Sequence, residues 1–503
     1  MPTLEVPSSE RPDPGSRSHS GTPLHLKDFV HDLIVKRRNE KNSEAHQIFR
    51  SYPGHAPKGM PQTVNPDEET VPGIQHPGST GVIYCTDRAM ANGFVYGNPE
   101  LGSCGTGQGA PEVGDIPDAP VRPQTVSLPH DSLEYAPTTG VKELRKAVAD
   151  LYNHTYRQGK KSQYTHENVC IVPGGRAGLS RVAAVVGDVY CGYQVPEYTT
   201  YSEVLSVFKR LVPIPTALTP ESRYKIDINQ AKHDISGQGL QVIVASNPRN
   251  PTGQVIAGDE LKDSTRGTFT MTKANRPASR SRGLPLELKL ACFAIDVDDD
   301  AVVLIDGLTK NWRLPGWRVC WVVGPKNLIS ALSQSGSFLD GGANHPLQLA
   351  AIPFLDPAHV EKEKLALQKH FRMKRDHVLK RLEEIGLPVA IPPQATFYIW
   401  LDLRALPAPL NDGLTFFEEL LKEKTIVVPG IFFEINPAHR RDLFSSPCHH
   451  FVRISFGPPL EDLDKGLNAI ERVMRRAKKE GMNGIGVDLI KSPIEGHFPG
   501  TNH

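Results

Sequence analysis

A lysine placed just beyond an apolar run is the first residue whose position suggests chemistry. Residues 301–305, Ala-Val-Val-Leu-Ile, read as a buried strand that breaks at Asp306-Gly307 into a loop presenting Lys310. Such a lysine either extends its ammonium to water along an apolar stem or serves as an amine nucleophile. Arg318 follows eight residues later, and a guanidinium can hold a phosphate through two hydrogen bonds. The two cations either hold opposite ends of one phosphorylated aldehyde or are simply exposed.

The most specific pattern is Asn-Pro-Arg-Asn-Pro-Thr-Gly at residues 247–253, directly after the apolar run 240–245. Proline restricts the residue before it to extended conformations, and Thr-Gly favours a turn. The pattern therefore predicts that the side-chain amide of Asn250 is directed at whatever lies beyond the strand.

A strand, a glycine pair and a helix follow one another at residues 169–187. Gly174, Gly175 and Arg176 stand where the helix begins, and a helix start leaves backbone N–H groups available to a phosphate. A plain tight turn has the same sequence, so both interpretations stand. Tyr198 follows the next short apolar run, where its ring could stack on a flat ligand.

Residues 102–114 are dense in glycine but do not form a dinucleotide-binding fingerprint, because alanine replaces the third glycine and proline follows it. Gly109 lets the backbone approach a ligand closely. Tyr135 precedes a helix predicted from the spacing of Val141, Leu144 and Val148, and spacing alone favours a packing role for this tyrosine.

An arginine, Arg453, interrupts the apolar strand Phe-Val-Arg-Ile-Ser-Phe at residues 451–456. A buried charge is costly unless it is paired, so an anion is expected beside it. His449 and His450 have no third ligand at a useful spacing, so we expect no metal site and place both at the surface.

Composition excludes several classes of protein. A net charge of +1 gives no basic footprint for nucleic acid or an anionic membrane, and no apolar run reaches spanning length. The seven cysteines form no CxxC pair, which argues against zinc or a disulfide framework and favours a reducing compartment, the cytoplasm. With 44 prolines and 43 glycines in 503 residues, we expect packed domains with unpacked tails.

These motifs, in this order, resemble the pyridoxal-phosphate aminotransferases of class I/II, over roughly residues 102–479. The resemblance implies an α/β fold of type I: a large domain with a mixed, mostly parallel sheet flanked by helices, and a smaller α+β domain. The expected organisation is a largely disordered arm (1–81), the first part of the small domain (82–134), the large domain (135–345), the rest of the small domain (346–480) and a tail (481–503).

The resemblance also implies residue roles. Lys310 is expected to form the internal aldimine with pyridoxal 5'-phosphate, and Arg453 to bind the substrate α-carboxylate near Gly109. Phe397 and Tyr398 look like the family's pocket wall. The cofactor phosphate is expected to be held by Gly174, Gly175, Arg176 and Arg318. Tyr198 is expected to stack on the cofactor ring, and Asn250 to hydrogen-bond its phenolic oxygen. Tyr135 is expected to reach the phosphate in the partner subunit of a homodimer.

Two departures from the family are visible. Gly307 stands three residues before the lysine, where many members carry serine, which removes one phosphate contact. The family also places a buried strand ending in Asp-x-x-Tyr between Asn250 and Lys310, and that aspartate keeps the cofactor ring protonated. Here residues 261–290 are basic and lack apolar periodicity, so we expect an irregular segment. Asp296 is the candidate stand-in, and the short acidic turn after it favours a hairpin.

Three functions remain open on this reading. The first is transamination between an L-amino acid and a 2-oxo acid, with Lys310 as the general base. The second is a lyase reaction of the aminocyclopropane-carboxylate synthase kind on the same fold. The third is a non-catalytic relic that keeps the fold but has lost the aspartate of the Asp-x-x-Tyr segment.

Overall fold

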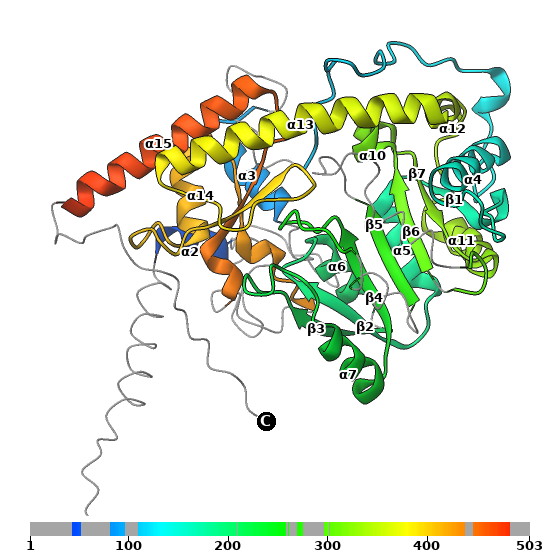
Figure 1. The fold of residues 1–503 in the computed structure, drawn as a ribbon, viewed down its shortest axis with the longest axis horizontal. Coiled ribbons are helices and arrows are strands. Elements are labelled where there is room, and N and C mark those ends of the chain that lie inside the picture. Colours follow the sequence, from blue (N-terminus) through cyan, green and yellow to red (C-terminus); the bar gives the residue numbers. More distant parts are fainter. Residues whose placement is uncertain are drawn as a thin grey trace, which may run out of the picture.

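The computed structural model describes residues 43–51, 81–95, 109–257 apart from 209, 260, 269–274, 296–437 apart from 301, and 446–482, with only the backbone of 269–274 and 480–482. Its centre is a seven-stranded sheet in the order β1-β7-β6-β5-β4-β2-β3 (Figure 1). The strands are β1 Val169–Val172, β2 Val189–Val195, β3 Leu211–Ala217, β4 Leu240–Asn247, β5 Phe269–Ala274, β6 Val302–Gly307 and β7 Cys320–Val323.

Strand β7 runs antiparallel to β1 and β6, and the other neighbouring pairs of this sheet are parallel. The mixed, mostly parallel sheet expected from the resemblance is confirmed. Parallel strands bring their carboxyl ends to one edge, so the segments after β2, β4 and β6 emerge near one another.

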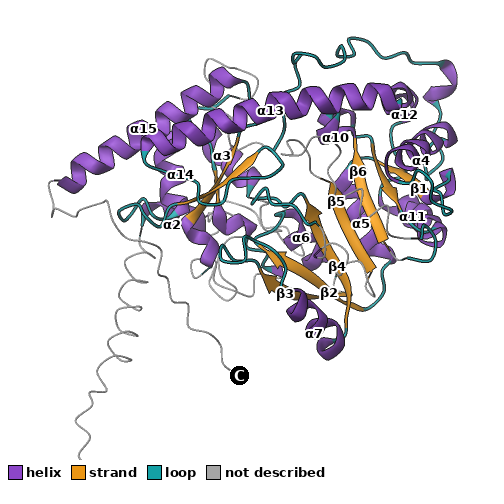
Figure 2. Ribbon diagram, viewed as in Figure 1, coloured by secondary structure: helices purple, strands orange, loops and turns teal. Residues whose placement is uncertain are grey.

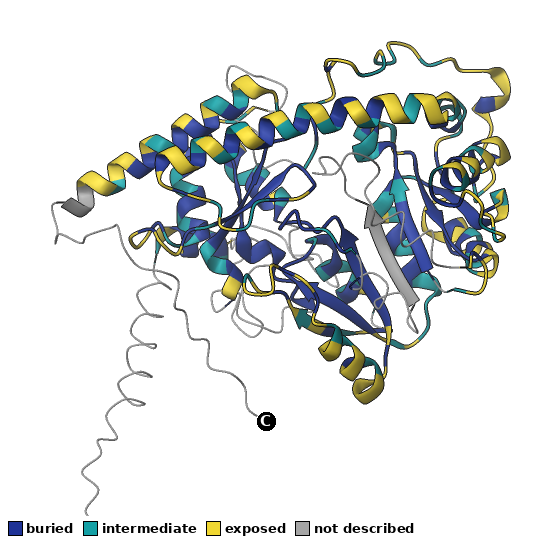
Figure 3. Ribbon diagram, in the orientation of Figure 1, coloured by how far each residue is buried: buried dark blue, intermediate teal, exposed yellow. Residues whose placement is uncertain are grey.

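Helices cover both faces of the sheet, and alternate residues of β6 show this (Figures 2 and 3). Val303 and Ile305 pack with α5 and α11, whereas Val302 and Leu304 pack with α4 and α12. The central strands are therefore apolar on both faces. The large domain contains α4 Lys142–Tyr156, α5 Gly175–Val185, α6 Thr200–Val207, α7 Ile228–Gln238, α10 Leu308–Asn311, α11 Lys326–Leu339 and α12 His345–Ala351.

The helix predicted from the spacing of Val141, Leu144 and Val148 is α4. Its residues Leu144, Val148 and Leu151 are buried against β1 and β7, as the helical spacing predicted.

The small domain contains a three-stranded antiparallel sheet in the order β8-β10-β9. Its elements are α13 Pro357–Ile385, β8 Tyr398–Asp402, α14 Gly413–Lys422, β9 Val428–Pro429, η5 Gly430–Phe433, β10 Phe451–Ser455 and α15 Leu460–Met482. The long helix α13 runs from the large domain to the small one (Figure 1). It ends at Gly386, whose φ of 89° is a left-handed cap.

Among the described residues, two short helices precede the matched motifs: α2 Glu44–Ser51 and α3 Val82–Ala91. Phe49 and Tyr84 pack on Phe432, with ring centres 5.8 and 5.4 Å away, respectively. Within the arm expected to be largely disordered over 1–81, α2 is an ordered segment, because three of its eight residues bury their side chains against the small domain. Most of 1–81 lies outside the described residues.

The interval expected to be irregular contains β5, which lies between β4 and β6 and is parallel to both. The prediction relied on apolar periodicity and missed the backbone requirement: the facing edges of β4 and β6 both need ladder partners, and threonine suits a strand. The expected hairpin is also wrong, because β5 and β7 already occupy both edges of β6. In the part of the chain described, no helix is both long and apolar enough to cross a bilayer.

Candidate active site

Lys310 lies in α10, the short helix that follows β6 at the carboxyl edge of the sheet. Its ammonium donates a hydrogen bond to the carbonyl oxygen of Gly109. Nζ also lies 5.7 Å from the ring centre of Phe397, which is fully buried. The amine therefore points into the protein, at backbone and an aromatic wall, which favours the nucleophile over a lysine that reaches for water.

Gly109 begins a segment, residues 109–122, that we call the strap; it contains no helix or strand. A Cβ at Gly109 would lie 2.9 Å from the Tyr398 hydroxyl oxygen and 3.8 Å from Nη2 of Arg453. Glycine fits here because a larger residue would push against Tyr398. The strap thus contacts Lys310 through its carbonyl and approaches Arg453 with its backbone.

Arg453 projects from the middle of β10 and is 2% exposed. Its guanidinium carbon lies 4.2 Å from the ring centre of Tyr398 and 5.0 Å from that of Phe433. Burial lowers the pKa of Arg453, and the neighbouring Tyr398 hydroxyl partly offsets this. The guanidinium lies close to two aromatic rings, and a guanidinium can bind both oxygens of a carboxylate, so the site suits a carboxylate.

Asn250 connects this group to the end of β4. Its side-chain oxygen accepts a hydrogen bond of 3.0 Å from Nη1 of Arg453, and the residue is 2% exposed. The sequence pattern at 247–253 predicted an amide directed beyond the strand, and the structure brings that amide to Arg453. Hydrogen bonds thus join Lys310 to Gly109 and Asn250 to Arg453, and the Cβ position of Gly109 lies 3.8 Å from Arg453, although the four residues are far apart in the chain.

A second group of residues lies at the start of α5. Gly174, the residue before this helix, has φ of 103°, and a Cβ there would lie 1.9 Å from Nη2 of Arg318. The guanidinium of Arg318 thus lies against the positive end of a helix, where an anion is favoured and a cation alone is not. Arg176, in the first turn, donates a 3.3 Å hydrogen bond from Nε to the hydroxyl of Tyr198.

Gly307 shows why the serine found in many family members is missing. A Cβ at this position would lie 2.4 Å from Cα of Cys320 on β7. Any side chain would push β6 and β7 apart, so glycine is required by the close strand pairing.

Within one chain, Tyr135 does not join the site residues described above. Its side chain is 98% exposed, on the cyan segment that arches beyond α13 before α4 in Figure 1. The packing role favoured from spacing alone is wrong, because a packed tyrosine would be covered within the chain.

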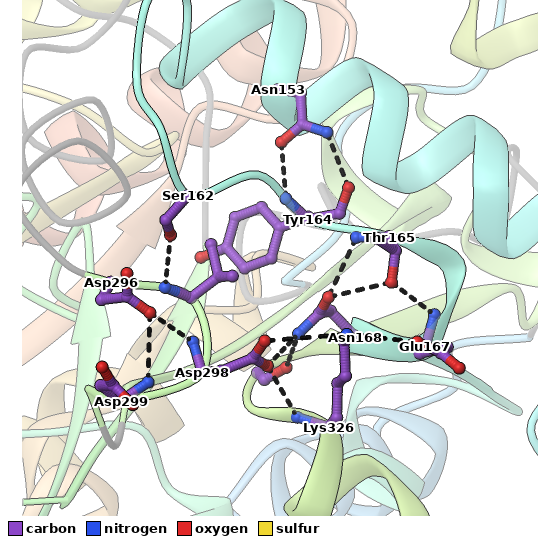
Figure 4. Close-up of polar contacts among 12 residues, drawn as sticks. Asn153, Ser162, Tyr164, Thr165, Glu167, Asn168, Asp296, Asp298, Asp299 and Lys326 are labelled. Carbon is purple, nitrogen blue, oxygen red and sulfur yellow. Dashed lines mark hydrogen bonds and ion pairs between the residues drawn. The ribbon is translucent and has the colours of Figure 1, made fainter.

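Asp296 does not replace the missing aspartate. It lies before β6, in an acidic turn whose polar contacts are drawn in Figure 4, whereas Lys310 follows the other end of that strand. Its carboxylate accepts hydrogen bonds from the backbone N–H groups of Asp298 and Asp299, at 3.0 and 3.3 Å. Six residues of strand extend roughly 20 Å, which is too far for a contact with a ligand at Lys310.

Sequence reasoning missed one buried carboxyl group, that of Glu197. It accepts hydrogen bonds from the backbone N–H groups of Tyr198 and Ser246, at 2.8 and 3.2 Å. Burial raises the pKa of Glu197 to about 7, although the positive charge of Arg249 opposes the shift. The signal in the sequence was an acidic residue between a buried strand and the candidate stacking tyrosine.

His449 and His450 were expected at the surface, but both rings are half-buried. Each Nδ1 lies within hydrogen-bond distance of a backbone carbonyl, of Ser446 for His449 and of Asn411 for His450. These contacts assign the pair to the local packing of the small domain.

Comparison with known proteins decides the family. The family model described as "Aminotransferase class I and II" matches residues 107–266 and 279–470, which is more than half of the chain. This chain belongs to that family. Members depend on pyridoxal phosphate, so the aminotransferase shares that cofactor. The unmatched residues 267–278 fall inside the interval that departs from the family pattern.

Two relatives illustrate the similarity. The aminotransferase is 24% identical over 392 residues to a probable aspartate/prephenate aminotransferase of Aquifex aeolicus, covering 74% of this chain and 90% of the relative. It is 26% identical over 363 residues to the (5-formylfuran-3-yl)methyl phosphate transaminase of Methanocaldococcus jannaschii, and the match covers 70% of this chain and 86% of the relative. Its fold matches the structure of aspartate aminotransferase from Thermus thermophilus with maleate, at a TM-score of 0.62 and 19% identity. The match covers 79% of this chain and 97% of the other.

The described residues fit the cofactor. Arg318 and the start of α5 provide a cationic cradle for a phosphate, with Gly174 leaving the space that a Cβ would fill. Tyr198, which Arg176 contacts, is a flat ring near that cradle, and Lys310 is an inward-pointing amine. One feature is missing from the sequence: no aspartate directly follows β5, where Asn-Arg-Pro stands at 275–277, outside the described residues.

Proposed function

We propose that the chain uses Lys310 to run pyridoxal-phosphate-dependent transamination between an L-amino acid and a 2-oxo acid. The observation that carries the proposal is the position of Gly109 in the strap: its carbonyl oxygen accepts a hydrogen bond from the Lys310 amine, and a Cβ built on it would lie 3.8 Å from Nη2 of Arg453. An α-amino acid carries an amino group and a carboxylate on the same carbon. An amine-reactive lysine and a carboxylate-binding arginine around one glycine therefore suit this class of substrate.

When bound, pyridoxal phosphate supplies an aldehyde that condenses with amines and a ring that withdraws electrons from the substrate Cα. In our proposal, Arg318 and the N–H groups of Gly175 and Arg176 hold the phosphate. Tyr198 stacks on the ring, and Asn250 hydrogen-bonds its phenolic oxygen. Lys310 takes the proton from Cα and returns it at the adjacent carbon of the cofactor.

The substrate carboxylate binds Arg453 in this proposal, and two aromatic side chains exclude water from it. Tyr398 and Phe433 flank the guanidinium, and Phe397 lies beside Lys310. In such a dry site a charged hydrogen bond is stronger than in water, so one arginine orients the substrate and aims its Cα–H bond at Lys310.

The experiment that tests this proposal is covalent trapping. Borohydride reduction of the protein with pyridoxal phosphate, followed by peptide mass spectrometry, should place the added mass on Lys310. The Lys310→Ala variant should carry no label. Label on another lysine, or equal labelling of the variant, would show that the cofactor is bound elsewhere.

The assembly and the compartment are proposed on separate grounds. The arching segment exposes Leu128, Leu133 and Tyr135 by 64, 69 and 98%, which supports a homodimer that covers them, with Tyr135 reaching the partner's phosphate. The five described cysteines are buried free thiols, which supports the cytoplasm. Light scattering should give twice the chain mass; a monomer would exclude the role of Tyr135.

A further inference from the structure

The loop that follows Lys310 contains a buried arginine for which the proposed chemistry has no use. Arg313 is 0% exposed and adopts φ of 53°, a conformation that non-glycine residues rarely take. A buried guanidinium and a left-handed backbone both cost free energy. Both costs fall three residues after the candidate catalytic lysine, so Arg313 must make contacts that compensate for them.

Those contacts run from the Lys310 loop to the strap and to α13. Nε of Arg313 donates a 3.0 Å hydrogen bond to Glu363 on α13. Nη1 donates to the carbonyl oxygens of Gly114 and Glu112, both in the strap.

The strap in turn donates hydrogen bonds to the backbone of the Lys310 loop. Nη1 and Nη2 of Arg122, at the end of the strap, donate to the carbonyl oxygens of Trp312 and Arg313, each at 2.8 Å. Nη1 of Arg122 also lies 4.0 Å from Glu363. Each arginine therefore holds backbone of the other segment, with one carboxylate between them; we call Arg122, Arg313 and Glu363 the clamp.

The strap depends on such side-chain contacts because it lacks secondary structure of its own. Its other main anchor, Glu112, accepts hydrogen bonds from Lys374 at 2.9 Å and from His370, both on α13. That anchor fixes the strap to the helix. Only the clamp, among the described contacts, joins the strap to the backbone immediately after Lys310 by hydrogen bonds to carbonyl groups.

We propose that Arg313 and Arg122 are positioning residues that set the Gly109 backbone between the Lys310 amine and Arg453. The proposal rests on the proposed function, because it assigns the clamp to substrate orientation. The clamp contacts neither the candidate phosphate cradle nor Arg453. Loosening it should therefore weaken substrate binding and leave cofactor attachment intact.

The test uses Arg313→Lys and Arg122→Lys in the full chain loaded with pyridoxal phosphate. Lysine keeps the charge but cannot bond a carboxylate and two carbonyl groups in one plane. KM for the fastest donor in a panel of the twenty L-amino acids should rise at least tenfold, with less than a threefold change in kcat. Borohydride labelling of Lys310 should stay at the level of the unaltered chain.

Hydrogen exchange gives the readout that a general loss of stability would not reproduce. The amide of Glu112, bonded to the Gly457 carbonyl oxygen, and its strap neighbours should exchange faster, while amides of β4 and β6 keep their rates. Arg88→Lys is the matched control: Arg88 forms a two-bond pair with Glu418 between α3 and α14, and no described hydrogen bond or ion pair joins either residue to the strap.

The outcomes separate the two proposals. If unaltered protein is not labelled at Lys310, the proposed function fails. If labelling is retained but KM and strap exchange in the clamp variants match those of Arg88→Lys, the clamp is only structural and the inference fails. Should Arg313→Lys not fold, Arg122→Lys decides alone, since its side chain is less buried.

Discussion

At the scale of single residues, the candidate site depends on charged groups in buried positions, where an unpaired charge costs free energy. Arg453 is the clearest, because a guanidinium inside a β-strand must be matched by an anion. The sequence alone was enough to single it out, as a charge inside an apolar run. The partner groups around it, Asn250 and two aromatic rings, come from distant segments and became visible only in the structure.

Replacing Arg453 with lysine should lower kcat/KM, because a point charge cannot match both carboxylate oxygens. The expected decrease corresponds to a rise of about 2–4 kcal/mol in the activation free energy. Labelling of Lys310 should be unchanged. The control is Arg404→Lys, an exposed arginine that pairs with Asp402 at the end of the same sheet. Equal kinetics for the two variants, measured with the fastest donor, would remove Arg453 from the site.

Glu197 predicts a pH dependence of stability. Its pKa of about 7 in the folded protein lies above the ordinary value of 4.5, so the folded state binds more protons between these pH values. The contribution of Glu197 to the free energy of unfolding is fully present below about pH 4.5 and is lost as the pH rises through 7. The loss amounts to about 3 kcal/mol, at 1.36 kcal/mol per pKa unit.

Urea unfolding of the unaltered chain and Glu197→Gln from pH 5 to 8 measures this effect. The stability of the unaltered chain relative to the variant should fall steadily over that range, because glutamine cannot ionise. A constant difference at every pH would mean that Glu197 keeps its charge in the folded protein.

At the scale of elements, strand ends and a helix start bring the site together. Helix α4 was predictable because its apolar residues recur with the helical period. Strand β5 was not, because its formation depends on the edges of β4 and β6 and not on its own pattern. The clamp was equally hidden: Arg122, Arg313 and Glu363 have no sequence spacing that relates them.

Gly174→Ala tests the helix start. The substitution strains a backbone at φ of 103° and drives a Cβ into Arg318, so it should lower stability by about 1 kcal/mol and sharply weaken binding of pyridoxal phosphate. Gly386→Ala is a matched control, since Gly386 has φ of 89° and open space around it. Titration of both variants with pyridoxal phosphate separates the effect of backbone strain from the loss of the phosphate site. Equal affinities of the two variants for the cofactor would mean that Arg318 and the start of α5 do not hold the phosphate.

At the scale of the whole molecule, two packed domains and α13 hold the Lys310 loop, the strap and β10 in one place (Figure 1). The helices α2 and α3 lie outside the family match and pack on the small domain, which sequence periodicity did not reveal because α2 is only eight residues long. The departure at 261–290 also acts at this scale. No aspartate directly follows β5 in the sequence, so no carboxylate at that position would keep a bound pyridoxal ring protonated, and we expect proton removal from Cα to be slow.

The most direct test of the central claim is a single-turnover reaction. Protein loaded with pyridoxal phosphate is mixed with each of the twenty L-amino acids, without any 2-oxo acid, and pyridoxamine phosphate and the oxo product are quantified. We predict one equivalent of each per site for at least one donor, at a rate below the range of about 1–1000 per second usual for enzymes, and none with Lys310→Ala. Release of ammonia without pyridoxamine phosphate, or no product from any donor while Lys310 is labelled, would contradict transamination by this chain.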